Sequence, residues 1–284
     1  MIYTDDKLTP IPNYPVYPPY HVGDYLEDHF RKKLITDNPA LSRDYIGISW
    51  TTLYCSGPRN IIQPYLDSLP IDGKYFTVSQ HDDAPSDILP PDTICFSAGG
   101  NVKGKNIIPI PLICSKLNLV NFTDTHTRNT LASFVGSLTH PIRQKLINFN
   151  EKSKNIQLYV KGWSPTVTQD EFKLFITYAL NSKFCLCPRG YGLNSFRLYE
   201  AMQLGCIPVI ITDEFYLPWE DEINWNDISV LIPENEMHNM ESILLSYSES
   251  RISEMKTNIK LIYDKYFTMN GMYQNIIKTL NRKH

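Results

Sequence analysis

Short apolar runs recur along the chain, and each is followed by a Gly, Pro or polar loop and then by a stretch of helical character. Runs of this length, rich in β-branched and aromatic residues, are typical of buried strands. They cover residues 45–50, 75–80, 93–97, 131–135, 156–160, 183–187 and 207–211. Strands that alternate with helices predict an α/β protein with parallel sheets. The segment 240–280 is expected to be helical.

The domain organisation follows from the length and from one irregular stretch. A chain of 284 residues allows about two domains. Residues 107–128 form an irregular connection rich in Pro, Asn and Thr. We therefore expect a first α/β domain at 1–128, a second at 129–262, and a last helix at 263–284, for which packing back on the first domain is one expectation. Five prolines within 10–19 favour an extended arm packed along its own domain over a ligand for another protein.

Composition narrows the function classes. The chain has 27 Lys and Arg against 30 Asp and Glu, a formal net charge of −3, which argues against nucleic acid as a partner. An anionic ligand must then be met by a local cluster of donors. The six cysteines lie scattered in apolar segments, which favours buried thiols in a reduced compartment over disulfides or a zinc site. Without a leader pattern or a long apolar run, we expect a soluble, cytoplasmic protein with no membrane anchor.

The segment 183–211 is the strongest local signal, because it has the pattern of one strand-loop-helix-strand unit. Gly190 and Gly192 lie in the loop, Asn194 or Ser195 can cap the helix, and Gly205 can end it in the left-handed conformation. Such a unit leaves backbone N–H groups unpaired at a helix N-terminus, where a pyrophosphate binds well.

Charged residues sit at that helix start. Arg189 in the loop and Arg197 in the first turn add guanidinium donors for phosphate, and Glu200 can accept the hydroxyls of a ribose. The alternative is that the glycines only make a turn, the arginines are solvated and Glu200 pairs with one of them. Neither the Walker pattern nor the Rossmann fingerprint is present, which disfavours phosphoryl and hydride transfer.

Several spaced motifs carry a family resemblance. They are Pro188-Arg189-Gly190, Ser195-Phe196-Arg197, Glu200-Ala201, Gly205-Cys206-Ile207-Pro208-Val209 and Leu217-Pro218-Trp219, with 222–225 and, more weakly, 134–136 and 140–143. In order and spacing this set resembles exostosin-type glycosyltransferases, glycosyltransferase family 47, over roughly residues 131–235. The resemblance implies the GT-B type of fold, two Rossmann-like domains facing across a cleft. It also implies a UDP-sugar donor bound by the second domain, an inverting reaction and no required metal or other cofactor.

The chain is shorter than the animal and plant exostosins and looks more like the compact, soluble members from large DNA viruses of algae or from bacteria. We accordingly expect a metal-independent inverting transfer of a sugar from a UDP-sugar to a hydroxyl of a glycan acceptor. Xylose is one candidate sugar, although no residue identifies it. The alternatives are a non-catalytic protein that binds a glycan or nucleotide, and a GDP-sugar transferase of the same architecture.

The donor site is expected to use the motif residues and one neighbouring loop. Arg143 follows Pro141, which can begin a helix, so its guanidinium can reach the same cleft; the alternative is a surface arginine. Tyr191 is the best candidate for stacking on uracil or sugar. The full donor set is Arg143, Arg189, Gly190, Tyr191, Asn194, Ser195, Arg197 and Glu200.

The base that deprotonates the acceptor is expected in the first domain, directly after a predicted strand. Asp82 is slightly preferred over Asp83, and His81 would orient the pair or contact the sugar. The alternative is an Asp turn before Ala84. No metal site is expected, because the nearest imitation of an Asp-x-Asp motif, residues 220–222, has the character of a solvated charge run.

Overall fold

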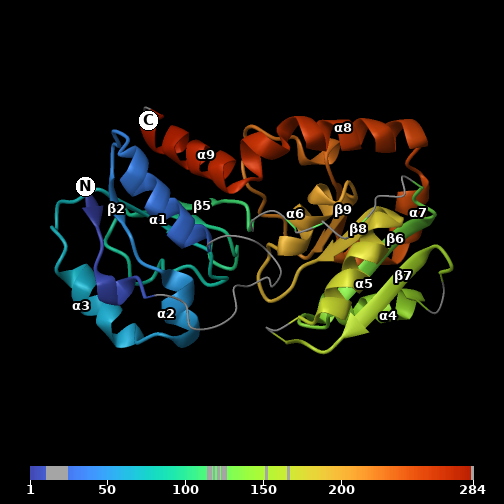
Figure 1. Ribbon diagram of the computed structural model, residues 1–284, viewed down its shortest axis with the longest axis horizontal. Coiled ribbons are helices and arrows are strands. Elements are labelled where there is room, and N and C mark those ends of the chain that lie inside the picture. The colour runs from blue at the N-terminus through green and yellow to red at the C-terminus, as the bar shows by residue number, and fades with distance from the viewer. Residues whose placement is uncertain are drawn as a thin grey trace.

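The computed structural model describes residues 1–10, 25–113, 117, 119, 122, 127–150, 153–164 and 167–282. It contains two parallel β-sheets, each in its own α/β domain, lying side by side along the longest axis of the molecule (Figure 1). The predicted α/β architecture of two domains, each built on a parallel sheet, is confirmed. Most of the proline-rich arm and Cys114 lie outside the described residues.

The first sheet is entirely parallel and its strands follow chain order, β1-β2-β3-β4-β5. Its strands are β1 (Ile2–Tyr3), β2 (Asp44–Ile46), β3 (Tyr75–Ser79), β4 (Ile94–Ser97) and β5 (Ile107–Pro109). The helices of this domain are α1 (Leu26–Asp37), α2 (Trp50–Ser56) and α3 (Ile62–Asp67). Phe30 of α1 packs edge-on against Phe76 of β3, whereas Trp50 of α2 donates to the Thr77 hydroxyl of the same strand. Successive β3 side chains alternate between faces, so α1 and α2 cover opposite faces of the sheet.

The second sheet has the order β10-β9-β8-β6-β7 and is also entirely parallel. Its strands are β6 (Thr130–Ser137), β7 (Ile156–Lys161), β8 (Ser182–Pro188), β9 (Ile207–Thr212) and β10 (Val230–Pro233). The chain runs from β6 to one neighbour, β7, and then crosses to the other, β8. A ligand crevice is expected outside the carboxyl ends of strands at such a reversal.

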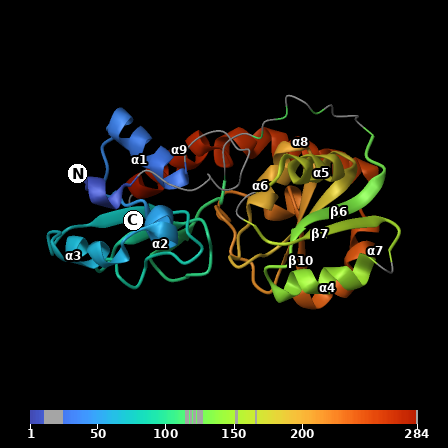
Figure 2. The same cartoon turned by 60° about the horizontal axis from the view of Figure 1, so that its bottom comes forward.

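Helices cover both faces of the second sheet (Figure 2). They are α4 (Pro141–Asn150), α5 (Gln169–Leu180), α6 (Phe196–Gln203), α7 (Met240–Leu245) and α8 (Glu249–Tyr266). Phe175 of α5 shares a buried cluster with Val135 and Cys185, and residues of α4, α7 and α8 share another with Phe134 and Phe184. Short 3-10 helices lie at Asp6–Leu8, Arg59–Ile61, Trp225–Asp227 and Glu234–Asn239.

The last helix, α9 (Met269–Asn281), runs back from the second domain and lies beside α1 of the first (Figures 1 and 2). Tyr273 of α9 packs against Phe30 with 5.3 Å between ring centroids, and the Ser42 hydroxyl donates to the Leu280 carbonyl oxygen. Both chain ends therefore lie on the first domain. The domain boundaries at residues 128 and 262 stay predictions. The strands of the first sheet precede residue 128, and those of the second sheet follow it.

Most predicted strands are present, with three corrections. The strand predicted at 45–50 ends at Ile46, because Trp50 begins α2 and is held by Thr77. The segment 107–128 was expected to be irregular, yet its first three residues form β5 along β4. The strands β1 and β10 were missed. The predicted helical character of 240–280 is confirmed by α7, α8 and α9.

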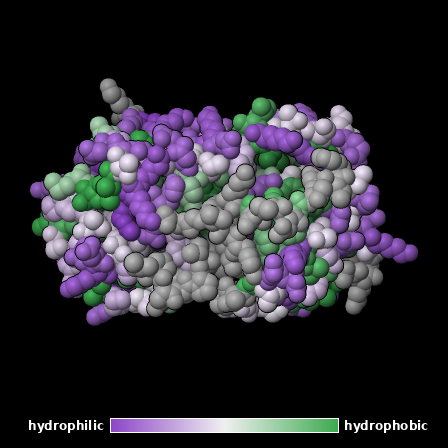
Figure 3. Space-filling view, viewed as in Figure 1, coloured by the Kyte–Doolittle hydropathy of each residue, from purple (hydrophilic) through white to green (hydrophobic). Residues whose placement is uncertain are grey.

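The face seen in Figure 3 is largely hydrophilic, with small separated hydrophobic patches. Several large apolar side chains are well exposed, among them Tyr191 at 61% and Trp163 at 65%. Across the described residues, none of the helices is both long and apolar enough to cross a membrane.

Candidate active site

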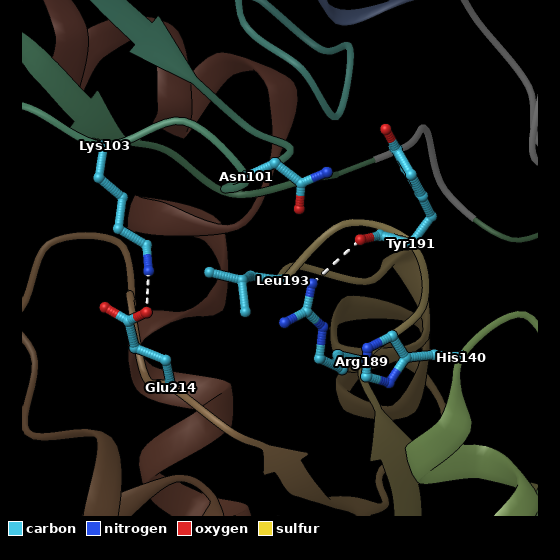
Figure 4. A pocket seen from close by; sticks show the side chains of 7 residues that line it. All are labelled: Asn101, Lys103, His140, Arg189, Tyr191, Leu193 and Glu214. Atoms are coloured by element: carbon cyan, nitrogen blue, oxygen red, sulfur yellow. Dashed lines mark hydrogen bonds and ion pairs between the residues drawn. The ribbon is translucent and has the colours of Figure 1, made fainter.

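A pocket of about 380 Å³ lies between the two domains, at the carboxyl ends of their strands (Figure 4). The first domain contributes Asn101 and Lys103 from the loop between β4 and β5. The second contributes residues that follow β6, β8 and β9, namely His140, Arg189, Tyr191, Leu193 and Glu214. The pocket thus includes the loops after β6 and β8, where the chain order reverses and a ligand is expected.

Arg189 places its guanidinium at this pocket. Its backbone N–H donates to the Ile211 carbonyl oxygen, which fixes the start of the loop against β9. Its guanidinium donates to the Asp213 carboxylate at 2.7 Å and to the Tyr191 carbonyl oxygen at 3.1 Å, and the side chain is 13% exposed. The Arg189 hydrogen bond holds the pKa of Asp213 below its usual value. The guanidinium is therefore preorganised beside the cavity.

The glycines of the loop permit close approaches. A Cβ on Gly190 would lie 3.0 Å from a guanidinium nitrogen of Arg143, and a Cβ on Gly192 would lie 2.2 Å from the Asp82 carboxylate. Gly192 thus lets the loop of residues 189–194 in the second domain (the donor loop) lie against Asp82 of the first domain. Gly205 has φ +65°, which confirms the predicted left-handed residue after α6.

Arg143 holds the donor loop from the neighbouring helix. Its guanidinium donates to the carbonyl oxygens of Ser137, Pro188 and Arg189 at 2.9 to 3.1 Å. These bonds join the ends of β6 and β8. The structure gives Arg143 a positioning role, and its predicted contact with phosphate stays a prediction.

Asn194 joins the two domains instead of leaving its groups free for a ligand. Its side-chain amide donates to the carbonyl oxygens of Ala98 at 2.9 Å and Ile110 at 3.3 Å, and its backbone N–H donates to Gly99. Ser195 is the N-cap of α6, and its hydroxyl accepts from the Arg197 N–H. Of the two predicted caps, Ser195 takes the position.

Arg197 and Glu200 bind each other. The Arg197 guanidinium donates to the Glu200 carboxylate at 3.1 Å and to the Val135 carbonyl oxygen at 2.5 Å, and it lies 4.1 Å from the centroid of the Phe175 ring. Glu200 is buried. This ion pair ties α6 to β6 and lies outside the residues that line the pocket. Direct contacts of Arg197 with phosphate and of Glu200 with ribose stay predictions.

Asp82 and Asp83 lie in different surroundings, Asp82 against Gly192 and Asp83 against the pocket residues Asn101 and Tyr191. Burial, with the neighbouring Asp83 charge, raises the pKa of Asp82 to about 6, and the Arg189 charge lowers it in part. Asp83 accepts from the Asn101 amide at 3.0 Å and from the Tyr191 hydroxyl of the other domain at 2.9 Å. A raised pKa is what a general base needs, and Asp83 accepts hydrogen bonds from both domains. The assignment of Asp82 as the base stays a prediction.

His81 supports this loop. Its Nδ1 accepts the Asp83 N–H at 3.1 Å, and its ring packs edge-on against Tyr54. Burial lowers the pKa of His81, which favours the neutral ring. The structure places it where it orients the acidic pair; a contact with sugar stays a prediction.

The remaining pocket residues were not among the predicted site residues. Lys103 forms an ion pair with Glu214, so this pair spans the two domains. His140 accepts the Ile142 N–H on Nδ1, and burial with the nearby Arg189 charge lowers its pKa. Asn101 binds Asp83. The signal that could have found them is position, because each follows a strand at its carboxyl end.

Two residues of the segment 220–222, Asp221 and Glu222, bind the C-terminal half of α9 and its C-cap. Glu222 pairs with Lys278 and Arg282, and Asp221 pairs with Arg282 at 2.8 Å. Among the described residues, His, Cys, Asp and Glu form no group of three that could hold a metal ion. Metal independence itself stays a prediction.

Comparison with known proteins decides the family. The model of the exostosin GT47 domain matches residues 72–247, which include Asp82, Asp83, Arg189 and all five strands of the second sheet. The chain belongs to the exostosin GT47 family. It is 38% identical over 86 residues to an exostosin-1 homolog of Caenorhabditis elegans, a match that covers 30% of this chain and 22% of the relative. It is 30% identical over 155 residues to a probable glycosyltransferase of Arabidopsis thaliana, covering 55% of this chain and 31% of the relative.

The matched part of this family member thus spans less than a third of either relative's length. Among solved structures, TarM has a TM-score of 0.44 at 12% identity, covering 79% of this chain and 53% of TarM. The GtfA/B complex has a TM-score of 0.43 at 12% identity, covering 89% and 60%. The resemblance to the short viral members stays an expectation.

Proposed function

We propose that this exostosin-family chain is an inverting glycosyltransferase that moves a sugar from a UDP-sugar to a hydroxyl of a glycan acceptor without a metal ion. Xylose is the first sugar to test. The observation that carries the proposal is that the Asp82 carboxylate of the first domain lies against Gly192, in the loop of the second domain that carries Arg189. The proposed base and the proposed phosphate-binding cation thus lie beside the same loop, which lines the pocket through Arg189, Tyr191 and Leu193.

The proposed reaction uses two side chains, Asp82 as the base and Arg189 at the leaving group. The Asp82 carboxylate takes the proton of the acceptor hydroxyl as the hydroxyl oxygen attacks the anomeric carbon of the donor sugar. The bond from that carbon to the diphosphate breaks on the opposite face, and UDP leaves with the bonding electrons. Arg189 stabilises the negative charge that grows on the leaving phosphate, and its fixed position lowers the cost of reorganisation.

Donor binding is tested by calorimetry with UDP, GDP and a panel of UDP-sugars in excess EDTA. UDP is expected to bind to the wild type, and Arg189→Ala should weaken it by about tenfold or more, since a charge-assisted hydrogen bond is lost. Tighter binding of GDP would favour the GDP-sugar transferase. No binding of any nucleotide would contradict the proposal.

Turnover separates an enzyme from a non-catalytic binding protein. Asp82→Asn should lower kcat by about 10² to 10⁴-fold and keep UDP binding. Asp87→Asn, the same change at an exposed position of the same loop, should alter neither. NMR of the product's anomeric proton tests inversion. A wild type that binds UDP but transfers no sugar to any acceptor of a broad glycan panel would favour the non-catalytic alternative.

A further inference from the structure

The pocket has two chemically different sides. Arg189 and His140 lie together on one side, and Lys103 and Glu214 form an ion pair on the other (Figure 4). The proposed function uses Arg189 for the phosphates and leaves the second pair without a role. If the diphosphate lies at Arg189, the sugar attached to it extends into the rest of the cavity, toward Glu214.

Glu214 is fixed at its backbone and accessible at its side chain. Its N–H donates to the Thr212 hydroxyl at 3.2 Å, and that hydroxyl donates to the Glu214 carbonyl oxygen at 2.9 Å. This local turn at the end of β9 sets where the side chain begins. The side chain is 59% exposed, against 31% for its partner Lys103. The carboxylate is therefore the member of the pair that a ligand in the cavity meets.

Lys103 is placed to orient that carboxylate. It comes from the first domain, pairs with Glu214 across the cleft, and lies 5.8 Å from the centroid of the Tyr216 ring. One carboxylate oxygen of Glu214 faces Lys103, which leaves the other for new hydrogen bonds. A carboxylate accepts hydrogen bonds only, so its natural partners in the pocket are hydroxyl groups, and a second carboxylate is repelled.

From this arrangement we infer that Glu214, oriented by Lys103, binds the hydroxyls of the donor sugar and selects a neutral sugar over a uronic acid. The inference rests on the proposed function and deepens it, because it assigns the sugar part of the donor to a separate pair of residues. On this inference, UDP without a sugar makes no contact with Glu214 or Lys103. The two halves of the donor can therefore be tested separately.

The test compares UDP, UDP-xylose, UDP-glucose and UDP-glucuronic acid by calorimetry in wild type, Glu214→Gln, Glu214→Ala and Glu214→Lys. In the wild type a neutral UDP-sugar should bind more tightly than UDP, and UDP-glucuronic acid should not. Glu214→Ala should remove that gain, a loss of about tenfold since the lost hydrogen bonds involve a charged group, while UDP affinity stays within about twofold. Glu214→Lys should raise the affinity for UDP-glucuronic acid.

Glu236→Gln is the matched control, because Glu236 is exposed on the 3-10 helix Glu234–Asn239 and lies outside the pocket lining. It should bind each ligand as the wild type does. Unchanged preference among sugars in all three Glu214 variants would overturn the subsite while UDP binding still upholds the proposed function. A wild type that binds no UDP would overturn both, and a Glu214 variant that loses UDP itself would show that the residue serves the nucleotide.

Discussion

Replacing Asp82 by Asn should make the protein more stable and less active at the same time. Burial and the neighbouring Asp83 raise the pKa of Asp82 from 3.8 to about 6. Because the folded-state pKa lies above the unfolded one, the stability that this group contributes is full below pH 3.8 and is lost as pH rises through about 6. At pH 7 the native protein therefore carries a buried charge that costs up to about 3 kcal/mol.

The neutral amide of Asn removes that cost. Asp82→Asn should raise the melting temperature at pH 7 by a few degrees, and the gain should vanish at pH 4, where the wild-type carboxyl is largely protonated in the folded state. The same substitution removes the proposed base, so kcat should fall by about 10² to 10⁴-fold. In the wild type, kcat/KM should rise with pH and level off above about 6, as the base loses its proton.

The assays are thermal unfolding between pH 4 and 8 and release of UDP in the presence of a glycan acceptor that the wild type uses. Asp83→Asn is the informative comparison, because Asp83 accepts from Asn101 and Tyr191 and its loss should lower stability. Turnover of Asp82→Asn within tenfold of the wild type would refute the assignment of the base. A lower melting temperature for Asp82→Asn at pH 7 would refute the electrostatic reasoning, whatever the activity.

Three further predictions follow from the cleft. Gly192→Ala places a Cβ 2.2 Å from the Asp82 carboxylate, so kcat should fall at least tenfold and by a larger factor than the affinity for UDP; equal loss of both would contradict this. Asn194→Ala leaves the carbonyl oxygens of Ala98 and Ile110 without this donor and should lower the free energy of unfolding by about 1 to 3 kcal/mol, measured by urea unfolding. Proteolysis between the domains should also become faster, and wild-type values in both assays would contradict a stabilising role for Asn194. Excess EDTA should leave turnover unchanged, and restoration of activity by Mg²⁺ or Mn²⁺ would contradict metal independence.

The sequence predicted the second domain better than the first. The strands β6 to β9 are long, apolar and separated by helices, so their pattern is unambiguous. By contrast, β1, β5 and β10 have two to four residues, which is too short for a periodic signal. The strand was predicted to extend to residue 50 because Trp50 is apolar. In the structure Trp50 begins α2, and its indole N–H donates to the Thr77 hydroxyl of β3. The local apolar pattern does not encode this tertiary contact.

The candidate site could be located from the sequence, but the directions of its side chains could not. The position of Arg143 and Arg197 near the donor loop follows from local motifs. Where each guanidinium points depends on carbonyl oxygens, such as those of Ser137 and Val135, that only the folded chain brings within reach. Asn194 is a stronger example, because its amide partners belong to the other domain. No local pattern encodes such a partner.

The donor loop connects the proposed phosphate site of the second domain with the proposed base of the first. The same short segment contributes Arg189 to the proposed phosphate site, the Tyr191 hydroxyl to Asp83, and the Asn194 amide to the first domain. Gly192 between them lets Asp82 approach. A displacement of this loop would therefore change the distance between the base and the leaving group as well as the affinity for the donor. Catalysis in this chain should consequently depend on contacts between the domains as strongly as on the charged groups themselves.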